Sequence, residues 1–264
     1  SFQYKKSFLK KIMKKIFKYK TIKNIDRESV IKSLNKNNFV ILRGLFKKKD
    51  ITRVLKKIKS NFDHKNDKIR ASNQYDLIKT NYQRFMFGMT GGVNGILKTN
   101  PRYFRVFYNP LWCKDIYGGR EILTRLTKTQ NYFYKLDENY GVSEKKTKHG
   151  LFVASRFQHY PKGGGFLASH KDIAAIRTAK NLGLNLFYNF LLIMTKKGKD
   201  YKNGGGFVIK NKKIINYEDV AEIGDVIVYN SKTEHGVLDI DSDKFPNLKE
   251  KSGRYIALST LFKW

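Results

Sequence analysis

Residues 157–172 read FQHYPKGGGFLASHKD, and this stretch carries the strongest structural signal in the chain. Aromatic residues lead into three consecutive glycines, and an apolar run then returns to His170 and Asp172. Glycines between two β-rich runs predict a strand, a tight turn and a second strand. Side chains at positions i and i+2 of an extended strand point to the same face. We therefore expect His170 and Asp172 to reach one metal ion together.

His235, further along the chain, completes a set of two imidazoles and one carboxylate. These ligands on one face of a metal leave the opposite positions open, which is typical of non-haem Fe(II) sites. Zinc hydrolases use the same ligand types. His-x-Asp by itself is a weak signal, since a surface turn with an incidental aspartate also produces it.

The order of the surrounding motifs strengthens the interpretation. An apolar strand at 191–194 precedes a glycine-rich turn at 203–206, and Gly224-Asp225 opens a second apolar strand ahead of His235. Arg254 then opens a last apolar run. In this order the chain resembles the Fe(II)/2-oxoglutarate-dependent dioxygenases, most closely the prolyl-hydroxylase-like and phytanoyl-hydroxylase-like branches.

The resemblance covers about residues 151–262, with a weaker match at 38–46, while residues 61–150 match no known pattern. It implies a fold of the α+β class with a mainly β core. That core would be a double-stranded β-helix, also called a jelly roll or cupin-like fold, with N-terminal helices packed on it. It also implies an oxidoreductase that uses Fe(II), 2-oxoglutarate and O₂ and releases succinate and CO₂.

The resemblance also implies roles for individual residues. The iron ligands would be His170, Asp172 and His235. Arg254 would form two hydrogen bonds to the distal carboxylate of 2-oxoglutarate, for which a planar guanidinium is suited, and Tyr160 would bind the same carboxylate. The separation of His235 from Arg254 exceeds the usual one in these families, and a hydrophilic segment at 241–252 fills it. Family members that halogenate have a small residue in place of the aspartate, so Asp172 favours hydroxylation, with desaturation or ring closure as alternatives.

The substrate is less well defined by the sequence. Gln158 and Arg156 alternate with Tyr160 along one strand and would face the same side. Further candidates for substrate binding are Asn185, Arg84 and Arg105, and each has a packing role as its alternative. We predict a hydroxylase of a small molecule, anionic or neutral, such as an amino acid, a sugar or a carrier-linked precursor. The alternatives are a hydroxylase or demethylase of protein or nucleic acid, and a non-catalytic jelly-roll binding module.

The chain divides into two predicted parts. Residues 1–25 form a basic amphipathic helical extension, because apolar residues recur at helical spacing between lysines. Residues 26–264 form a single dioxygenase domain, with a helical, substrate-binding part over about 26–150 and the jelly-roll catalytic core over about 151–264. The extension could pack on its own domain, or residues 1–20 could contact an anionic membrane.

Local patterns predict the individual elements. Helices are expected after the N-cap Asp26, over 49–59 and around 110–137. Short strands separated by turn residues are typical of an antiparallel sandwich or barrel, and they are expected at 39–42, 152–160, 184–195, 206–210, 213–217, 225–229, 236–239 and 254–262.

The composition limits the remaining classes. The formal net charge of +32 could indicate a polyanionic partner such as nucleic acid. We favour a compositional bias, since the lysines are scattered along the whole chain. Cys113 is the single cysteine, which excludes an intramolecular disulfide and fits a reducing compartment. The sequence has no run of about 18 apolar residues and no secretory pattern, so we expect a cytoplasmic protein.

Overall fold

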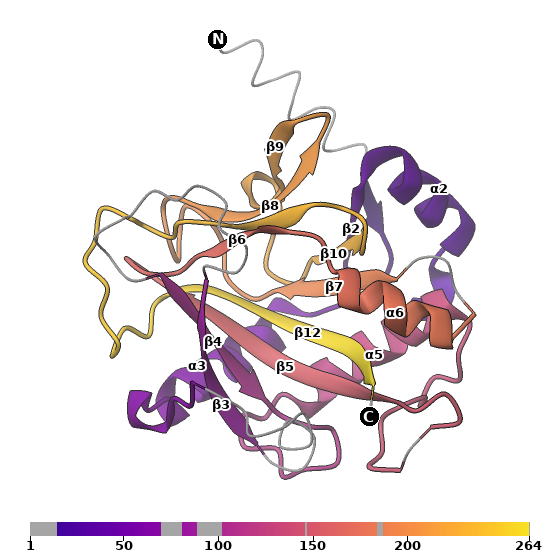
Figure 1. The fold of residues 1–264 in the computed structure, drawn as a ribbon, viewed down its shortest axis with the longest axis horizontal. Helices are drawn as coiled ribbons and strands as arrows, with labels where there is room; N and C mark the ends of the chain where they lie inside the picture. Colours follow the sequence, from indigo (N-terminus) through magenta and orange to yellow (C-terminus); the bar gives the residue numbers. More distant parts are fainter. Residues whose placement is uncertain (1–14, 70–80, 89–101, 146, 184–186, 264) are drawn as a thin grey trace.

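Two β-sheets of unequal size face each other, and helices cover the outer face of the larger one (Figure 1). The computed structural model describes residues 15–69, 81–88, 102–145, 147–183 and 187–263. The larger sheet has eight strands in the order β1-β2-β10-β7-β12-β5-β4-β3, and the smaller one has four in the order β6-β11-β8-β9. All pairs are antiparallel except β1 with β2.

The bounds of the elements follow the chain. The larger sheet consists of β1 (Ile16–Lys18), β2 (Phe39–Arg43), β3 (Tyr82–Phe87), β4 (Tyr103–Tyr108), β5 (Leu151–Pro161), β7 (Tyr188–Ile193), β10 (Val226–Asn230) and β12 (Gly253–Lys263). The smaller sheet consists of β6 (Leu167–His170), β8 (Gly205–Lys210), β9 (Lys213–Asn216) and β11 (His235–Leu238). The α-helices are α2 (Arg27–Asn37), α3 (Lys48–Asn61), α5 (Arg120–Tyr134) and α6 (Ile173–Asn181). Single 3₁₀ turns are η1 (Ile22–Asn24), η2 (His64–Asn66) and η3 (Tyr217–Asp219).

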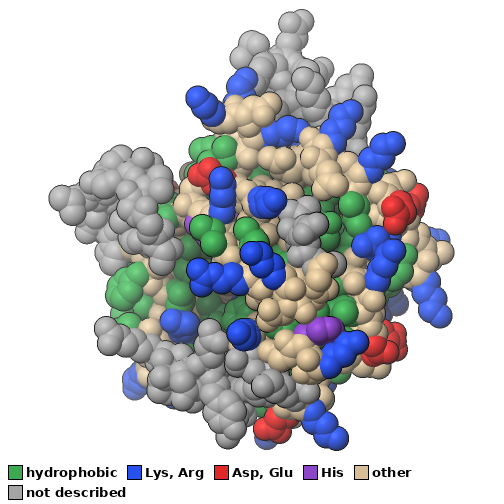
Figure 2. All heavy atoms as spheres, turned by 45° about the vertical axis from the view of Figure 1, so that its right-hand side comes forward, with side chains coloured by type: hydrophobic (Ala, Val, Ile, Leu, Met, Phe, Trp, Pro, Cys, Tyr) green, Lys and Arg blue, Asp and Glu red, His purple; other side chains and the backbone are tan. Residues whose placement is uncertain are grey.

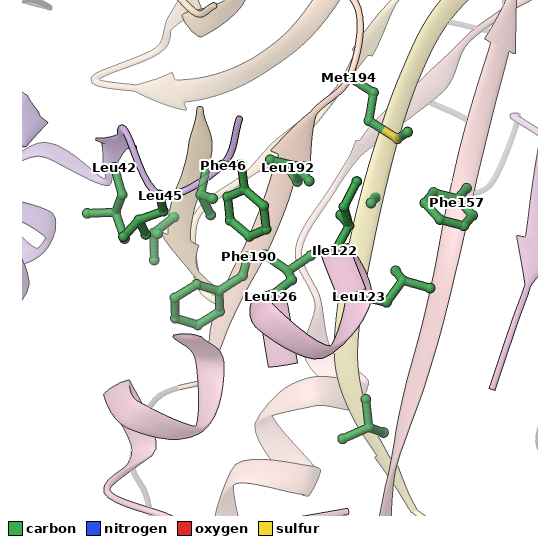
Figure 3. Close-up of a cluster of buried hydrophobic side chains, with 14 of the residues drawn as sticks. Leu42, Leu45, Phe46, Ile122, Leu123, Leu126, Phe157, Phe190, Leu192 and Met194 are labelled. Carbon is green, nitrogen blue, oxygen red and sulfur yellow. The ribbon is translucent and has the colours of Figure 1, made fainter. Parts of the chain in front are cut away.

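Strand alternation gives the larger sheet two apolar faces. On β12, Tyr255 and Ala257 join the cluster under the helices, whereas Ile256 and Leu258 join the cluster between the sheets. Figure 3 shows part of the first cluster, in which Leu123 of α5 lies among side chains of the sheet. A sheet buried on both faces favours near-continuous apolar strands, as in β2, β7 and β10. The second face, between the sheets, is the one that holds the candidate site.

Several expected elements are confirmed. The Asp26 carboxylate accepts a hydrogen bond from the Ser29 amide at 3.0 Å and caps α2, and Asn38 ends that helix with a φ of 68°. The basic helix expected at 49–59 is α3, with Ile51, Val54 and Ile58 buried. The α+β class with a large antiparallel sheet is confirmed as well.

Other expectations were wrong in their extent. Residues 16–18, predicted to continue an N-terminal helix, form β1 because their main chain pairs with β2; residues 1–14 lie outside the described residues. The part over about 26–150 was expected to be helical, but β3 and β4 lie in it and extend the larger sheet beyond β5. The helix expected around 110–137 is confined to Arg120–Tyr134. Among the described residues, no helix combines the length and the apolar character needed to cross a membrane.

His159 lies on the helix-covered face of β5 and is fully buried. Its ring stacks on Tyr255 with centroids 4.2 Å apart, and Nε2–H donates to the Ser252 carbonyl at 2.9 Å. No hydrogen-bond partner for the Nδ1 atom is found in the part of the chain that the structure describes. Burial lowers the pKa of His159 to about 3, so the imidazole is neutral in the folded protein.

Acid should therefore destabilise the fold through His159. The unfolded chain takes up this proton near the ordinary pKa of 6.5 and the folded chain only near 3. The contribution of His159 to the free energy of unfolding is complete above about pH 6.5. It is lost as the pH falls below that value, at about 1.4 kcal/mol per pH unit. Urea unfolding at pH 7 and at pH 5 measures this effect. Between these two pH values the free energy of unfolding of His159→Phe should fall by about 2 kcal/mol less than that of the parent chain. Equal pH slopes of stability for the parent chain and His159→Phe would contradict the assignment.

Candidate metal centre

Three neighbouring elements bring the predicted ligands together. His170 is the last residue of β6, and His235 is the first residue of β11, directly opposite it in the antiparallel register. Asp172 is the N-cap of α6, and its amide donates to the Ser231 carbonyl at 3.1 Å. We expected Asp172 to share a strand face with His170, but the chain turns into α6 after the strand. The turn, rather than the strand periodicity, directs the carboxylate to the two imidazoles.

The ligand atoms converge on one point. The distances are 3.6 Å from His170 Nε2 to Asp172 Oδ1 and 3.4 Å from His235 Nε2 to Asp172 Oδ2. One ligand atom from each of the three residues lies within 4.8 Å of the others. Such a cluster can take one metal ion without a change of backbone.

Main-chain carbonyls orient both imidazoles in the same way. Nδ1–H of His170 donates to the Ala168 carbonyl at 2.8 Å, and Nδ1–H of His235 donates to the Thr233 carbonyl at 2.9 Å. Each bond keeps the proton on Nδ1 and leaves the Nε2 lone pair directed at the common point. Two neutral imidazoles and a carboxylate with open positions opposite fit Fe(II).

The surroundings set the protonation of the three groups. Burial raises the pKa of Asp172, but the hydrogen bond with His170 and the charge of His235 outweigh it and the net shift is downward. Burial lowers the pKa of His235, and the nearby carboxylate does not fully compensate. For His170, the effect of burial is smaller than that of Asp172 and the Ala168 carbonyl, so its pKa is raised. An ionised carboxylate beside a neutral His235 is the state that binds a divalent cation.

Asn189 supports the carboxylate; it shares the strand parity of the predicted Asn185 but was not itself among the predicted site residues. Its Nδ2 donates to Asp172 Oδ2 at 2.6 Å from the start of β7. The available signal was alternation, because Asn189 and Leu191 occupy the same face of that strand and both line the cavity. Tyr229 of β10 covers His235 from the other side, with ring centroids 4.4 Å apart.

A cavity of about 670 Å³ lies between the two sheets next to the triad. Arg156, Gln158 and Tyr160 line it, as their alternation on β5 predicted. The Tyr160 hydroxyl donates to Gln158 Oε1 at 2.9 Å. Burial raises the pKa of Tyr160 to about 12, so the phenol keeps its proton and remains a hydrogen-bond donor.

Arg254 also lines the cavity, but part of its guanidinium is already engaged. Nε and Nη2 each lie 2.6 Å from Glu218 Oε1, and both side chains are almost completely buried. Glu218, on η3, accepts a further hydrogen bond from the Tyr201 hydroxyl. Arg254 Nη1 is buried and has no hydrogen-bond partner among the described residues. The edge formed by Nε and Nη2 thus faces a protein carboxylate, and Nη1 is the group left for a ligand.

Of the remaining predicted substrate residues, those that the structure describes do not line the cavity. Arg105 lies on the opposite face of the sheet, where Nε is 2.9 Å from Asp67 Oδ2 and Nη2 donates to the Leu248 carbonyl at 2.8 Å. Its role is structural, because strand alternation on β4 turns it away from the cavity. Arg84 on β3 is not among the described residues that line the cavity. Asn185 lies outside the described residues.

No family model matches this sequence, and no curated protein matches it. Solved structures do. A prolyl hydroxylase from Trichoplax adhaerens, in complex with a hypoxia inducible factor peptide fragment, has a TM-score of 0.52 at 14% identity, over 90% of this chain and 89% of that one. A 2OG-Fe(II) oxygenase family oxidoreductase from Burkholderia pseudomallei has a TM-score of 0.50 at 11% identity, over 93% of this chain and 94% of that one. A prolyl-4-hydroxylase from Pseudomonas putida has a TM-score of 0.50 at 11% identity, over 90% of this chain and 99% of that one. The resemblance inferred from the motifs is confirmed for the fold.

Proposed function

We propose that this chain is an Fe(II)- and 2-oxoglutarate-dependent oxygenase that hydroxylates a C–H bond of a small molecule. The domain is a double-stranded β-helix within residues 26–264. The observation that carries the proposal is the triad, in which both Nε2 atoms and the Asp172 carboxylate converge beside a cavity. The oxygenase structures with the same fold support it.

Each residue has a role in this proposal. His170, Asp172 and His235 hold the metal, and Asn189 keeps the carboxylate in place through its 2.6 Å hydrogen bond. When bound, Fe(II) with 2-oxoglutarate and O₂ supplies the oxidising chemistry, with succinate and CO₂ as products.

The chain's own contribution at the cofactor is binding and orientation. Arg254 would present Nη1 to the distal carboxylate of 2-oxoglutarate, and the Tyr160 hydroxyl would turn from Gln158 Oε1 to donate a second hydrogen bond to it. The guanidinium carbon of Arg254 lies 4.9 Å from the centre of the Tyr160 ring, so the two groups act at the same end of the cavity. Leu191, Ile256 and Leu258 give this cavity apolar walls that exclude water. Charge interactions are stronger in such a site than in water.

The size of the cavity supports a small substrate, because about 670 Å³ lies within the usual range of about 300–1,000 Å³ for small-molecule sites. The charge pattern does not favour nucleic acid. Figure 2 shows lysine and arginine side chains scattered over the visible face rather than gathered in one stripe.

Binding of the cofactor gives the first test. Anaerobic addition of Fe(II) and then 2-oxoglutarate should produce the weak visible charge-transfer band of an iron-bound 2-oxo acid. Succinate lacks the oxo group that completes the chelate, so it should give no band. Absence of the band with 2-oxoglutarate in correctly folded, iron-loaded protein would contradict the proposal. Succinate release in air, measured across amino acids, sugar nucleotides, peptides and oligonucleotides, then separates a small-molecule substrate from a macromolecule.

A further inference from the structure

The charges that line the cavity are unbalanced. Among the described lining residues the cations are Arg156, Arg177, Arg254 and Lys263, and Asp172 is the one carboxylate. Asp172 belongs to the metal site, and Arg254 is neutralised by Glu218. The remaining positive charge has no counterpart in the described protein.

Arg156 is the buried part of this excess. Its residue is only 8% exposed, yet no carboxylate among the described residues forms a salt bridge with it. Nη1 donates to the Ala154 carbonyl at 2.8 Å, and the guanidinium carbon lies 5.2 Å from the centre of the Phe262 ring. These contacts orient the group without supplying a negative charge. A buried cation without a partner carries a large desolvation cost, which an anionic ligand would remove.

Arg156 and Arg254 serve separate regions of the cavity. Arg254 is opposite Tyr160 in the register of β5 with β12, and Arg156 is four residues from Tyr160 along β5. At about 3.3 Å per residue this is a separation of about 13 Å along the strand. Arg177 of α6 and Lys263 of β12 line the same cavity, and Figure 1 shows α6 next to the C-terminal end of β12. Both side chains are exposed, so they attract an anion that Arg156 then binds.

We propose that Arg156 binds a carboxylate or phosphate group of the molecule that is oxidised, so that the substrate is a small organic anion. This assignment rests on the proposed function. The planar guanidinium matches both oxyanions through paired hydrogen bonds. The apolar walls contributed by Leu167, Leu191 and Val237 accommodate the carbon skeleton. Burial lowers the pKa of Arg156, but a guanidinium remains charged near neutral pH.

The test measures binding of model anions to the anaerobic complex with Fe(II) and 2-oxoglutarate, in which the cofactor already occupies the Arg254 end. The probes are hexanoate, hexyl phosphate and neutral hexanamide, titrated by calorimetry into the parent chain, Arg156→Gln and Arg156→Lys. Loss of a charge-assisted bond should weaken binding of the preferred anion about 10- to 100-fold in Arg156→Gln. Arg156→Lys should recover part of the loss, and hexanamide should bind equally to all three. The stronger of hexanoate and hexyl phosphate identifies the oxyanion.

Three results would overturn the assignment. The first is equal affinity of both anions for the parent chain and Arg156→Gln. The second is a loss of 2-oxoglutarate affinity in Arg156→Gln with probe binding unchanged, which would place Arg156 in the cofactor site. The third is a marked fall in the melting temperature of Arg156→Met, because a buried cation kept for a ligand should be neutral or stabilising to remove. Failure of the proposed function is distinguishable, since it removes the visible band from the parent chain itself.

Discussion

Replacing His235 with alanine should abolish succinate formation and weaken Fe(II) binding by more than about 100-fold. The effect should exceed the roughly 10- to 100-fold loss that follows removal of a residue that only supports a metal ligand. His235 is 7% exposed and its Nε2 is 3.4 Å from Asp172 Oδ2, so its removal takes away a nitrogen ligand that the fold holds in position. The remaining His170 and Asp172 would hold the metal from one side only. Iron content after gel filtration and the visible band with 2-oxoglutarate are the measurements.

His64→Ala is the matched control for this prediction. This histidine also sits beside an aspartate, with Nδ1 3.4 Å from Asp63 Oδ1, but it lies outside the cavity. Its removal should leave iron content, band and turnover at parental levels. Full iron content in His235→Ala would show that the metal is bound elsewhere.

Replacing Glu218 with glutamine should lower the free energy of unfolding by about 3–5 kcal/mol, the usual result of leaving one partner of a buried ion pair without its counter-charge. Arg254 and Glu218 side chains are 1% and 3% exposed, so water cannot solvate the arginine that remains. In this variant the Tyr201 hydroxyl also donates to a neutral amide oxygen instead of the Glu218 carboxylate, which is the stronger acceptor. A loss of this size is a large fraction of the roughly 5–15 kcal/mol that stabilises a typical domain. Urea unfolding at pH 7 measures it.

The neighbouring residue provides the control. Asp219 forms an ion pair with Lys197 at 2.7 Å, with side chains 41% and 23% exposed. Asp219→Asn should change stability by no more than about 1 kcal/mol, as exposed pairs do. The double variant Glu218→Gln with Arg254→Met should recover most of the loss, because it removes the unpaired charge. An effect of Glu218→Gln no larger than that of Asp219→Asn would show that the pair is not what stabilises this region.

The sequence predicted those features that depend on local periodicity. Alternation placed Arg156, Gln158 and Tyr160 on one face of β5, and the structure has them on the cavity side. Apolar spacing predicted α3, and the side-chain chemistry of Asp26 predicted the start of α2.

Features that depend on contacts between distant segments could not be predicted in this way. Glu218 meets Arg254 only because η3 lies against β12 in the folded chain. Arg105 resembled a ligand-binding arginine until its partner Asp67, on a segment without regular periodicity, was known. β3 and β4 were missed because arginines interrupt their apolar pattern, and these arginines are accommodated only in the assembled sheet.

Alternation on β12 also bears on how the chain can change in evolution. Arg254 faces the cavity and Tyr255 faces the helices. A single-residue insertion within the strand would exchange the two faces, and with them the proposed cofactor site and the core. The segment 242–252 ahead of the strand is less constrained: it is mostly exposed, and it is attached to the rest of the fold through carbonyls, those of Asn247 to Tyr103, Leu248 to Arg105 and Ser252 to His159. Carbonyl acceptors are present whatever the side chain, so this segment can accumulate substitutions, whereas Asp241, whose buried carboxylate accepts from the Lys202 and Asn203 amides, cannot.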